Sequence, residues 1–168
     1  MLKLVIFVLS LLLSTGAYEN YITGTFHLHY FHDCATIIGS YDEYYRLWKD
    51  DWDPPDYDKS LENEDQIKDC EIYVNGKKIN FTYEYECQEK NTGNYTYNIV
   101  YKFNKPLVNA GFLFYTSDLY SLDFTHFDSS HLMDMTQMFS TSFKLDYVNF
   151  KNFNAENILY MNEMFDIC

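Results

Sequence analysis

The sequence contains none of the short motifs by which common enzyme classes are recognised. It has no G-x-S-x-G nucleophile elbow, no phosphate-binding glycine loop and no Cys–His signature of a thiol protease. None of its four cysteines belongs to a C-x-x-C pair, so a zinc or thioredoxin-like site is not expected. The sequence therefore predicts a protein that is not an enzyme and that has no catalytic residues, metal ligands or cofactor.

Positive charge is also scarce. The 168 residues include 12 Lys and Arg against 25 Asp and Glu, which gives a formal net charge of −13. Because an acidic surface repels the phosphates of nucleic acids and of anionic membranes, binding to either is disfavoured. Aromatic residues are abundant instead, with 17 Tyr and 14 Phe, and such residues suit strands and partly wetted interfaces.

The one long apolar run lies at the N-terminus. Residues 4–13 are apolar apart from one serine, follow Lys3, and precede small residues that end at Ala17. This order is typical of a secretory signal peptide, and the run is about half of the roughly 20 residues that a membrane span needs. We therefore expect residues 1–17 to be removed and the rest to be secreted or displayed at the cell surface, without a membrane span. A buried first helix or strand is the alternative.

Cysteines and glycosylation sequons fit an extracellular location. The four cysteines allow three complete disulfide pairings, among which the sequence does not choose. The disulfide candidates are Cys34, Cys70, Cys87 and Cys168. The sequons Asn80-Phe81-Thr82 and Asn94-Tyr95-Thr96 predict glycans on Asn80 and Asn94.

The residues after the signal segment have strand and helix periodicities. Over residues 22–30 apolar side chains share one parity, which predicts a half-buried strand. Residues 35–38 are expected to return as a second strand. In residues 40–49 the aromatic side chains fall at helical spacing, with Ser40 and Asp42 as possible N-caps, so a short helix is predicted there.

Residues 71–103 predict a three-stranded antiparallel meander. The Asn75-Gly76 pair favours a type I′ hairpin turn that places Ile72 opposite Ile79. Alternation continues after that turn and again over residues 95–103. In this register Cys70 and Cys87 lie too far apart for a disulfide bond.

A repeat of 26 residues occupies the C-terminal part of the chain. Eight apolar positions, namely Leu119, Leu122, Phe124, Phe127, Leu132, Met135, Met138 and Phe139, recur as Leu145, Val148, Phe150, Phe153, Ile158, Met161, Met164 and Phe165. In each unit the earlier positions alternate like a strand, whereas the later ones are spaced like one face of a short helix. Since one such unit is too small to bury its own apolar face, stacking of the units into a solenoid is expected.

The repeat resembles the BspA-like leucine-rich repeat. Residues 119–139 follow the pattern L-x-x-L-x-F-x-x-F-D-S-x-x-L-x-x-M-x-x-M-F, and the second copy closes with Met-Phe-Asp-Ile-Cys. Residues 107–119 resemble the degenerate half-repeat that opens such arrays, and residues 72–79 resemble the β-rich leader that precedes them. Ser142 replaces the cysteine expected in the first copy. The resemblance implies a secreted or surface protein with adhesion, host-contact or ligand-binding roles, and no catalysis.

These patterns together predict an α+β fold. A small antiparallel β-rich domain with a short helix is expected over residues 18–105, followed by a short leucine-rich-repeat-like solenoid of about two and a half units over residues 106–168.

The expected function is that of a secreted or surface-exposed interaction or adhesion module. It would bind a protein or glycan ligand through the repeat strands or the open repeat end, or would self-associate through residues 145–168. One alternative is a truncated, non-binding fragment of a longer repeat protein. Another is a small secreted hydrolase or metal-binding protein, in which His27 and His29 on one strand face would be the first ligands.

Overall fold

The structure of the chain is a computed structural model that describes residues 20–28, 34–51, 56–86 and 95–168. The expected signal segment, residues 1–17, lies outside the described residues. The described part is β-rich, with two short α-helices and a mixed sheet, in agreement with an α+β class. None of its helices is long and apolar enough to cross a membrane.

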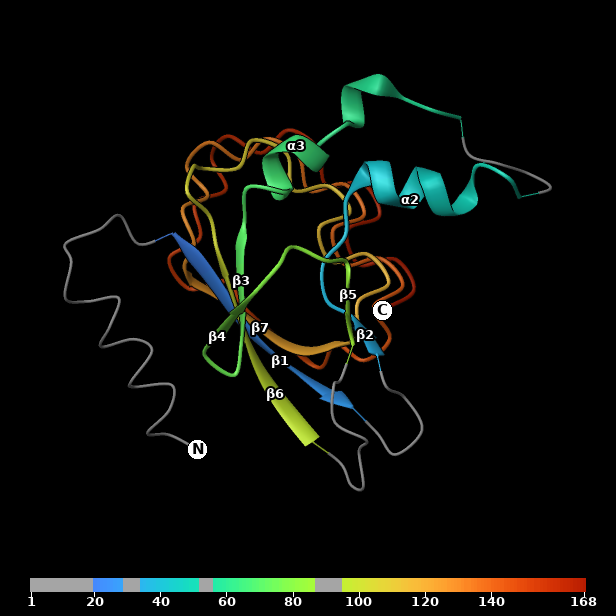
Figure 1. Cartoon of the computed structure of the whole chain (residues 1–168). Helices are drawn as coiled ribbons and strands as arrows, with labels where there is room; N and C mark the ends of the chain where they lie inside the picture. Colours follow the sequence, from blue (N-terminus) through green and yellow to red (C-terminus); the bar gives the residue numbers. More distant parts are fainter. Residues whose placement is uncertain (1–19, 29–33, 52–55, 87–94) are drawn as a thin grey trace.

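A six-stranded sheet organises the molecule (Figure 1). Its strand order is β4-β3-β6-β1-β7-β8, in which β7 and β8 are parallel and all other neighbours are antiparallel. The strands are β1 (Tyr21–Leu28), β3 (Glu71–Val74), β4 (Lys77–Ile79), β6 (Tyr95–Lys102), β7 (Leu119–His126) and β8 (Tyr147–Asn149).

The first strand follows the predicted alternation. Ile22, Phe26 and Leu28 are buried on one face of β1, as the sequence pattern indicated. The predicted return strand over residues 35–38 forms in part, but it does not pair with the first strand. A short strand, β2 (Cys34–Thr36), forms there, but it pairs with β5 (Glu84–Glu86) in a separate two-stranded sheet.

The hairpin register is confirmed, and the meander is wrong. Ile72 lies opposite Ile79, and both turn residues have positive φ, 49° at Asn75 and 80° at Gly76. However, β6 pairs with β3 and leaves β4 at the sheet edge, while the chain after Ile79 departs to form β5. There Tyr85 packs edge-on against Phe26, with ring centroids 5.6 Å apart, so the second sheet covers part of the first.

The predicted helix forms as α2 (Tyr41–Trp48), with Ser40 as its N-cap. The Ser40 hydroxyl accepts a hydrogen bond from the backbone N–H of Glu43 at 3.0 Å. Asp42 does not cap this helix. Its carboxylate accepts the backbone N–H groups of Asn63 at 3.1 Å and Glu64 at 3.0 Å, and so caps α3 (Glu64–Ile67), which follows the 3-10 turn η1 (Lys59–Leu61).

The repeat units stack in the predicted register. Leu122 lies beside Val148 in the parallel pair β7–β8, an offset of 26 residues, and the rings of Phe124 and Phe150 stack at 5.2 Å. The expected half-repeat also takes part, because isolated parallel bridges join Asn109 to Asp134 and Asp134 to Tyr160.

No helix forms in the repeats within the described residues. Three turn segments stand in its place: segment 1 (residues 109–117), segment 2 (134–142) and segment 3 (160–168). Positive φ recurs at equivalent positions of these segments, which a right-handed helix does not allow. These residues are Phe112, Gln137 and Glu163 at the first position, and Thr116, Thr141 and Ile167 at the second.

The two predicted domains share one sheet and one core. Strand β1 lies between β6 and β7, so the sheet continues across the expected boundary at residue 105. A single buried cluster contains both Ile22 and Met138. The close approach of β1 to β7 explains Gly24, since a Cβ atom there would lie 2.6 Å from the Ser121 carbonyl oxygen.

Candidate interaction surface

A ladder of backbone hydrogen bonds joins the three turn segments. Four N–H groups of each earlier segment, at every second residue, donate to carbonyls of the next segment. The direction is reversed only where segments 2 and 3 begin, since the Asp134 N–H donates to the Val108 carbonyl at 3.4 Å and the Tyr160 N–H to the Met133 carbonyl at 3.1 Å. From segment 1 to segment 2 the bonds are Ala110 to Asp134, Phe112 to Thr136, Phe114 to Met138 and Thr116 to Ser140, at 2.9 to 3.0 Å. From segment 2 to segment 3 they are Met135 to Tyr160, Gln137 to Asn162, Phe139 to Met164 and Thr141 to Asp166, at 2.8 to 2.9 Å.

Columns of phenylalanine rings run alongside this ladder. Phe114 stacks on Phe139 with centroids 5.9 Å apart, and Phe139 stacks on Phe165 at 5.0 Å. A separate column places Phe127 on Phe153 at 6.2 Å. Such offset contacts between rings add to the burial of apolar area, so each unit is held to the next by both backbone and side chains.

The N-terminal half of the chain covers the first end of this stack. The Asn63 side chain donates to the Gly111 carbonyl at 2.6 Å, and the Gly39 N–H donates to the Leu113 carbonyl at 2.7 Å. Thr36 and Asp118 exchange two further bonds of 2.8 Å, from the Asp118 N–H to the Thr36 carbonyl and from the Thr36 N–H to the Asp118 carboxylate. The carbonyls that segment 1 presents outward are thus already bonded at two positions.

A polar cluster fastens the covering helices to the rest. Glu64 accepts hydrogen bonds from the Tyr83 hydroxyl and from Arg46, the latter at 2.6 Å, and pairs with Lys68 at 2.9 Å. Burial raises the pKa of the Glu64 carboxyl, but the hydrogen bonds from Tyr83, Lys68 and Arg46 outweigh it and lower that pKa to about 2. Glu64 is therefore ionised at neutral pH and serves as an acceptor that ties α3 to α2.

The second end of the stack is uncovered. Met135 and Phe139 of segment 2 are 1% and 0% exposed, whereas their equivalents Met161 and Phe165 are 57% and 49% exposed. Other large apolar side chains of the last unit share this exposure: Tyr147, Leu159, Tyr160 and Ile167. The predicted core residues of the first unit are all buried. In the second unit, the predicted core residues other than Met161 and Phe165 are partly buried: Val148, Phe150, Phe153, Ile158 and Met164.

Backbone donors are also uncovered at this end. By the periodicity of the ladder, the next donors are the N–H groups of Met161, Glu163, Phe165 and Ile167. None of them has an acceptor among the described residues. The sequence pattern identified the apolar positions of this surface but gave no signal for the donor row, because the row depends on the turn geometry.

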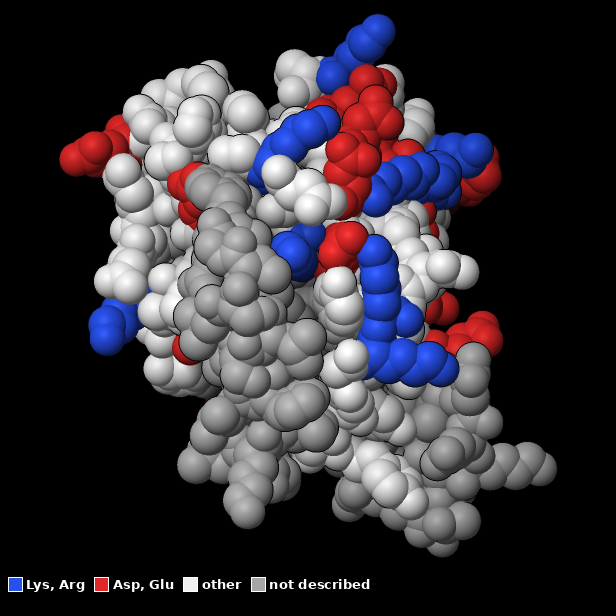
Figure 2. Space-filling view, turned by 60° about the vertical axis from the view of Figure 1, so that its left-hand side comes forward, with Lys and Arg blue, Asp and Glu red and all other residues white. Residues whose placement is uncertain are grey.

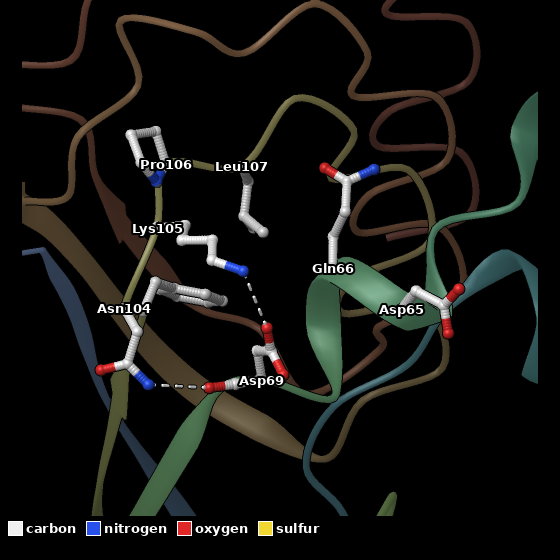
Figure 3. A pocket seen from close by; sticks show the side chains of 8 residues that line it. Asp65, Gln66, Asp69, Asn104, Lys105, Pro106 and Leu107 are labelled. Carbon is white, nitrogen blue, oxygen red and sulfur yellow. Dashed lines mark hydrogen bonds and ion pairs between the residues drawn. The ribbon is translucent and has the colours of Figure 1, made fainter.

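Two other features of the described chain are weaker candidates. A small pocket between α3 and residues 103–107 contains the exposed ion pair of Lys105 and Asp69, 3.5 Å apart (Figure 3). On the face drawn in Figure 2, basic side chains lie next to acidic ones. Lys78 and Glu71, for example, form an ion pair. Neither feature gathers buried polar groups around a ligand-sized cavity.

The expected metal ligands, glycan sites and cysteines are only partly described. His27 hydrogen-bonds to the Thr96 hydroxyl at 3.0 Å, and His29 lies outside the described residues, among which no group of three potential ligands comes together. Asn80 is exposed, and Asn94 lies outside the described residues. Of the disulfide candidates, Cys34, Cys70 and Cys168 are unbridged, and Cys87 is not described.

Comparison with protein-family models, with curated proteins and with solved structures finds no match for the chain.

The contrast between equivalent positions predicts different effects of the same mutation. Phe139→Ala should destabilise the fold by about 3–5 kcal/mol, because it leaves a cavity in a buried column. Phe165→Ala should cost only about 1 kcal/mol, since the ring is half exposed. Urea unfolding of both variants measures the difference, and equal losses of stability would show that the end of the stack is covered in solution.

The Glu64 cluster predicts a pH-dependent stability. Glu64→Gln should destabilise the fold at pH 7 by about 1 kcal/mol, since solvent screens part of the charged network. The lowered pKa of Glu64 means that its contribution is complete above its ordinary value of 4.5 and is lost as pH falls to about 2. Urea unfolding at pH 7 and pH 2 should therefore show the difference between variant and parent closing. Asp65→Asn, a change of the exposed neighbour, is the control and should show no such convergence.

Proposed function

We propose that the chain is a secreted or surface-exposed, non-enzymatic interaction module of the BspA-like repeat type. On this proposal the three turn segments with β7 and β8 are coils of a short solenoid, and the N-terminal β-rich part is the element that covers its first coil. The constant offset between equivalent hydrogen bonds supports this, as does the recurrence of positive φ. Secretion is supported by the signal-like N-terminus and by the exposed sequon residue Asn80.

One observation carries the binding function. Met161 and Phe165 are about half exposed at positions where Met135 and Phe139 are buried. Contiguous exposed apolar surface with a defined row of backbone donors is typical of a protein-interaction site. We therefore place the binding surface at the open end, on residues 145–168, and the preferred ligand class is protein.

Paired lysine substitutions test this placement. The assay measures binding of the secreted chain, joined into tetramers to raise avidity, to extracellular proteins displayed on an array. The double variant Met161→Lys with Phe165→Lys should abolish this binding, because it places charges on the apolar surface. The matched control is Leu47→Lys with Trp48→Lys on α2, since Leu47 and Trp48 are comparably exposed at 64% and 42%.

The control variant should retain every interaction of the parent chain. Interactions that survive the change at the open end but disappear with the change on α2 would move the binding surface to the helix. A parent chain that binds no displayed protein would contradict the proposed function.

A further inference from the structure

Within the described residues, β4 is the last strand on one side of the six-stranded sheet (Figure 1). The backbone groups of a strand with two neighbours alternate between them. The Asn75 N–H donates to the Asn98 carbonyl of β6 at 2.8 Å, so the odd-numbered residues of β3 bond toward β6 and the even-numbered ones toward β4. Lys78 lies opposite the odd-numbered Tyr73, and its own backbone groups are therefore directed to the free side of β4.

Asn80 continues this edge beyond the end of β4. It lies two residues after Lys78, so the alternation directs its N–H to the free side as well. The Asn80 N–H has no acceptor among the described residues. A strand that docked onto the edge would bond to the backbones of both Lys78 and Asn80, because the outward groups recur at every second residue.

Two features make this edge prone to pairing with another chain. Ile79 and Phe81 are half-buried where they pack against the core, and a docked strand would bury them further. Lysines commonly guard sheet edges, but Lys78 is paired with Glu71 at 2.5 Å, which leaves Lys77 as the uncompensated charge of the strand. Outward backbone groups beside apolar side chains of this kind are a template for strand pairing between copies.

Asn80 is also the acceptor residue of a glycosylation sequon. It is exposed, and its side-chain amide makes no hydrogen bond within the described part of the chain. The hydroxyl of the sequon residue Thr82 donates to the Glu84 carbonyl at 2.7 Å in an exposed contact. Strand parity places Asn80 on the outer face of the sheet with Lys78. A glycan there lies beside the position, about 4.8 Å from β4, that a docked strand would take.

We propose that Asn80 carries an N-linked glycan that keeps the free edge of β4 from pairing with the same edge of a second copy. In the transfer, the Asn80 Nδ2 bonds to the anomeric carbon of an oligosaccharide carried on a lipid diphosphate. The bond from that carbon to the diphosphate breaks, the diphosphate leaves with the electron pair, and one amide proton is released. The inference rests on the proposed function, because a secreted chain meets this donor, and it adds a role for the modification.

Glycosylation and self-association can be measured on the full chain, secreted from a glycosylating host. Mass spectrometry should find a glycan on Asn80, and sedimentation should show that Asn80→Gln associates about ten-fold more tightly than the parent chain. Thr82→Ala removes the sequon but retains Asn80, and it should associate as Asn80→Gln does. Asn94→Gln removes the other sequon, and this matched control should sediment as the parent does. No glycan on Asn80, or no gain in association without it, would overturn the proposal.

A proline substitution locates the contact. Lys78→Pro removes an outward N–H from the edge and leaves the bonds between β4 and β3 in place, because that N–H is not one of them. Added to Asn80→Gln, it should return the sedimentation to that of the parent chain. Association that persists in the double variant would place the contact elsewhere and would overturn the assigned edge.

Enzymatic removal of the glycan provides the test if Asn80→Gln is not secreted. The folded Asn94→Gln chain, treated with an amidase that cleaves N-linked glycans, should gain association, and unchanged sedimentation would overturn the role of the glycan.

The same measurements separate this inference from the proposed function. A glycan on Asn94 with none on Asn80, or unchanged sedimentation of Asn80→Gln, would leave the interaction surface on residues 145–168 intact. Absence of glycans from both asparagines would contradict secretion, and with it the proposed function.

Discussion

The structure of the C-terminal half depends on one directional set of backbone hydrogen bonds. Segments 1 and 2 close tight turns with some of their N–H groups and donate alternate ones to the next segment. A helix would use these donors internally, so this arrangement always needs a neighbour on the accepting side. The positive φ values at residues such as Gln137 and Thr141 follow from the same requirement, because they turn alternate N–H groups outward along the stack.

The N-terminal half of the chain covers the repeat stack at one end only. Strand β1 continues the sheet beside β7, and Asn63 and Gly39 donate to the carbonyls that segment 1 presents outward. Its helices are held by Ser40, Asp42 and the Glu64 cluster. These polar residues thus hold α2 and α3 in place over the first end of the repeat stack. Among the described residues, the opposite end presents the donor row and the exposed rings instead.

Sequence periodicity predicted the parts of this fold that local rules determine. The Asn75-Gly76 turn fixed the pairing of Ile72 with Ile79, and the repeat offset fixed the stacking of Phe124 on Phe150. The expected helices failed because the M-x-x-M-F spacing fits successive tight turns as well as a helical face, and no glycine marks the positive φ of Gln137. The strand order failed for another reason, since the pairing of β6 with β3 and β1 is a non-local choice that alternation does not encode. The donors of the open end are backbone groups, which no side-chain pattern reveals.

Hydrogen exchange of the free chain tests the directional ladder most directly. The amides of Met135, Gln137, Phe139 and Thr141 donate to segment 3 and should be strongly protected. The equivalent amides of Met161, Glu163, Phe165 and Ile167 should exchange at rates close to those of an unstructured peptide, because they have no acceptors. Equal protection of the two sets in a monomeric sample would contradict an open, donating end. So would rapid exchange of both sets, which would mean that the turn segments do not stack.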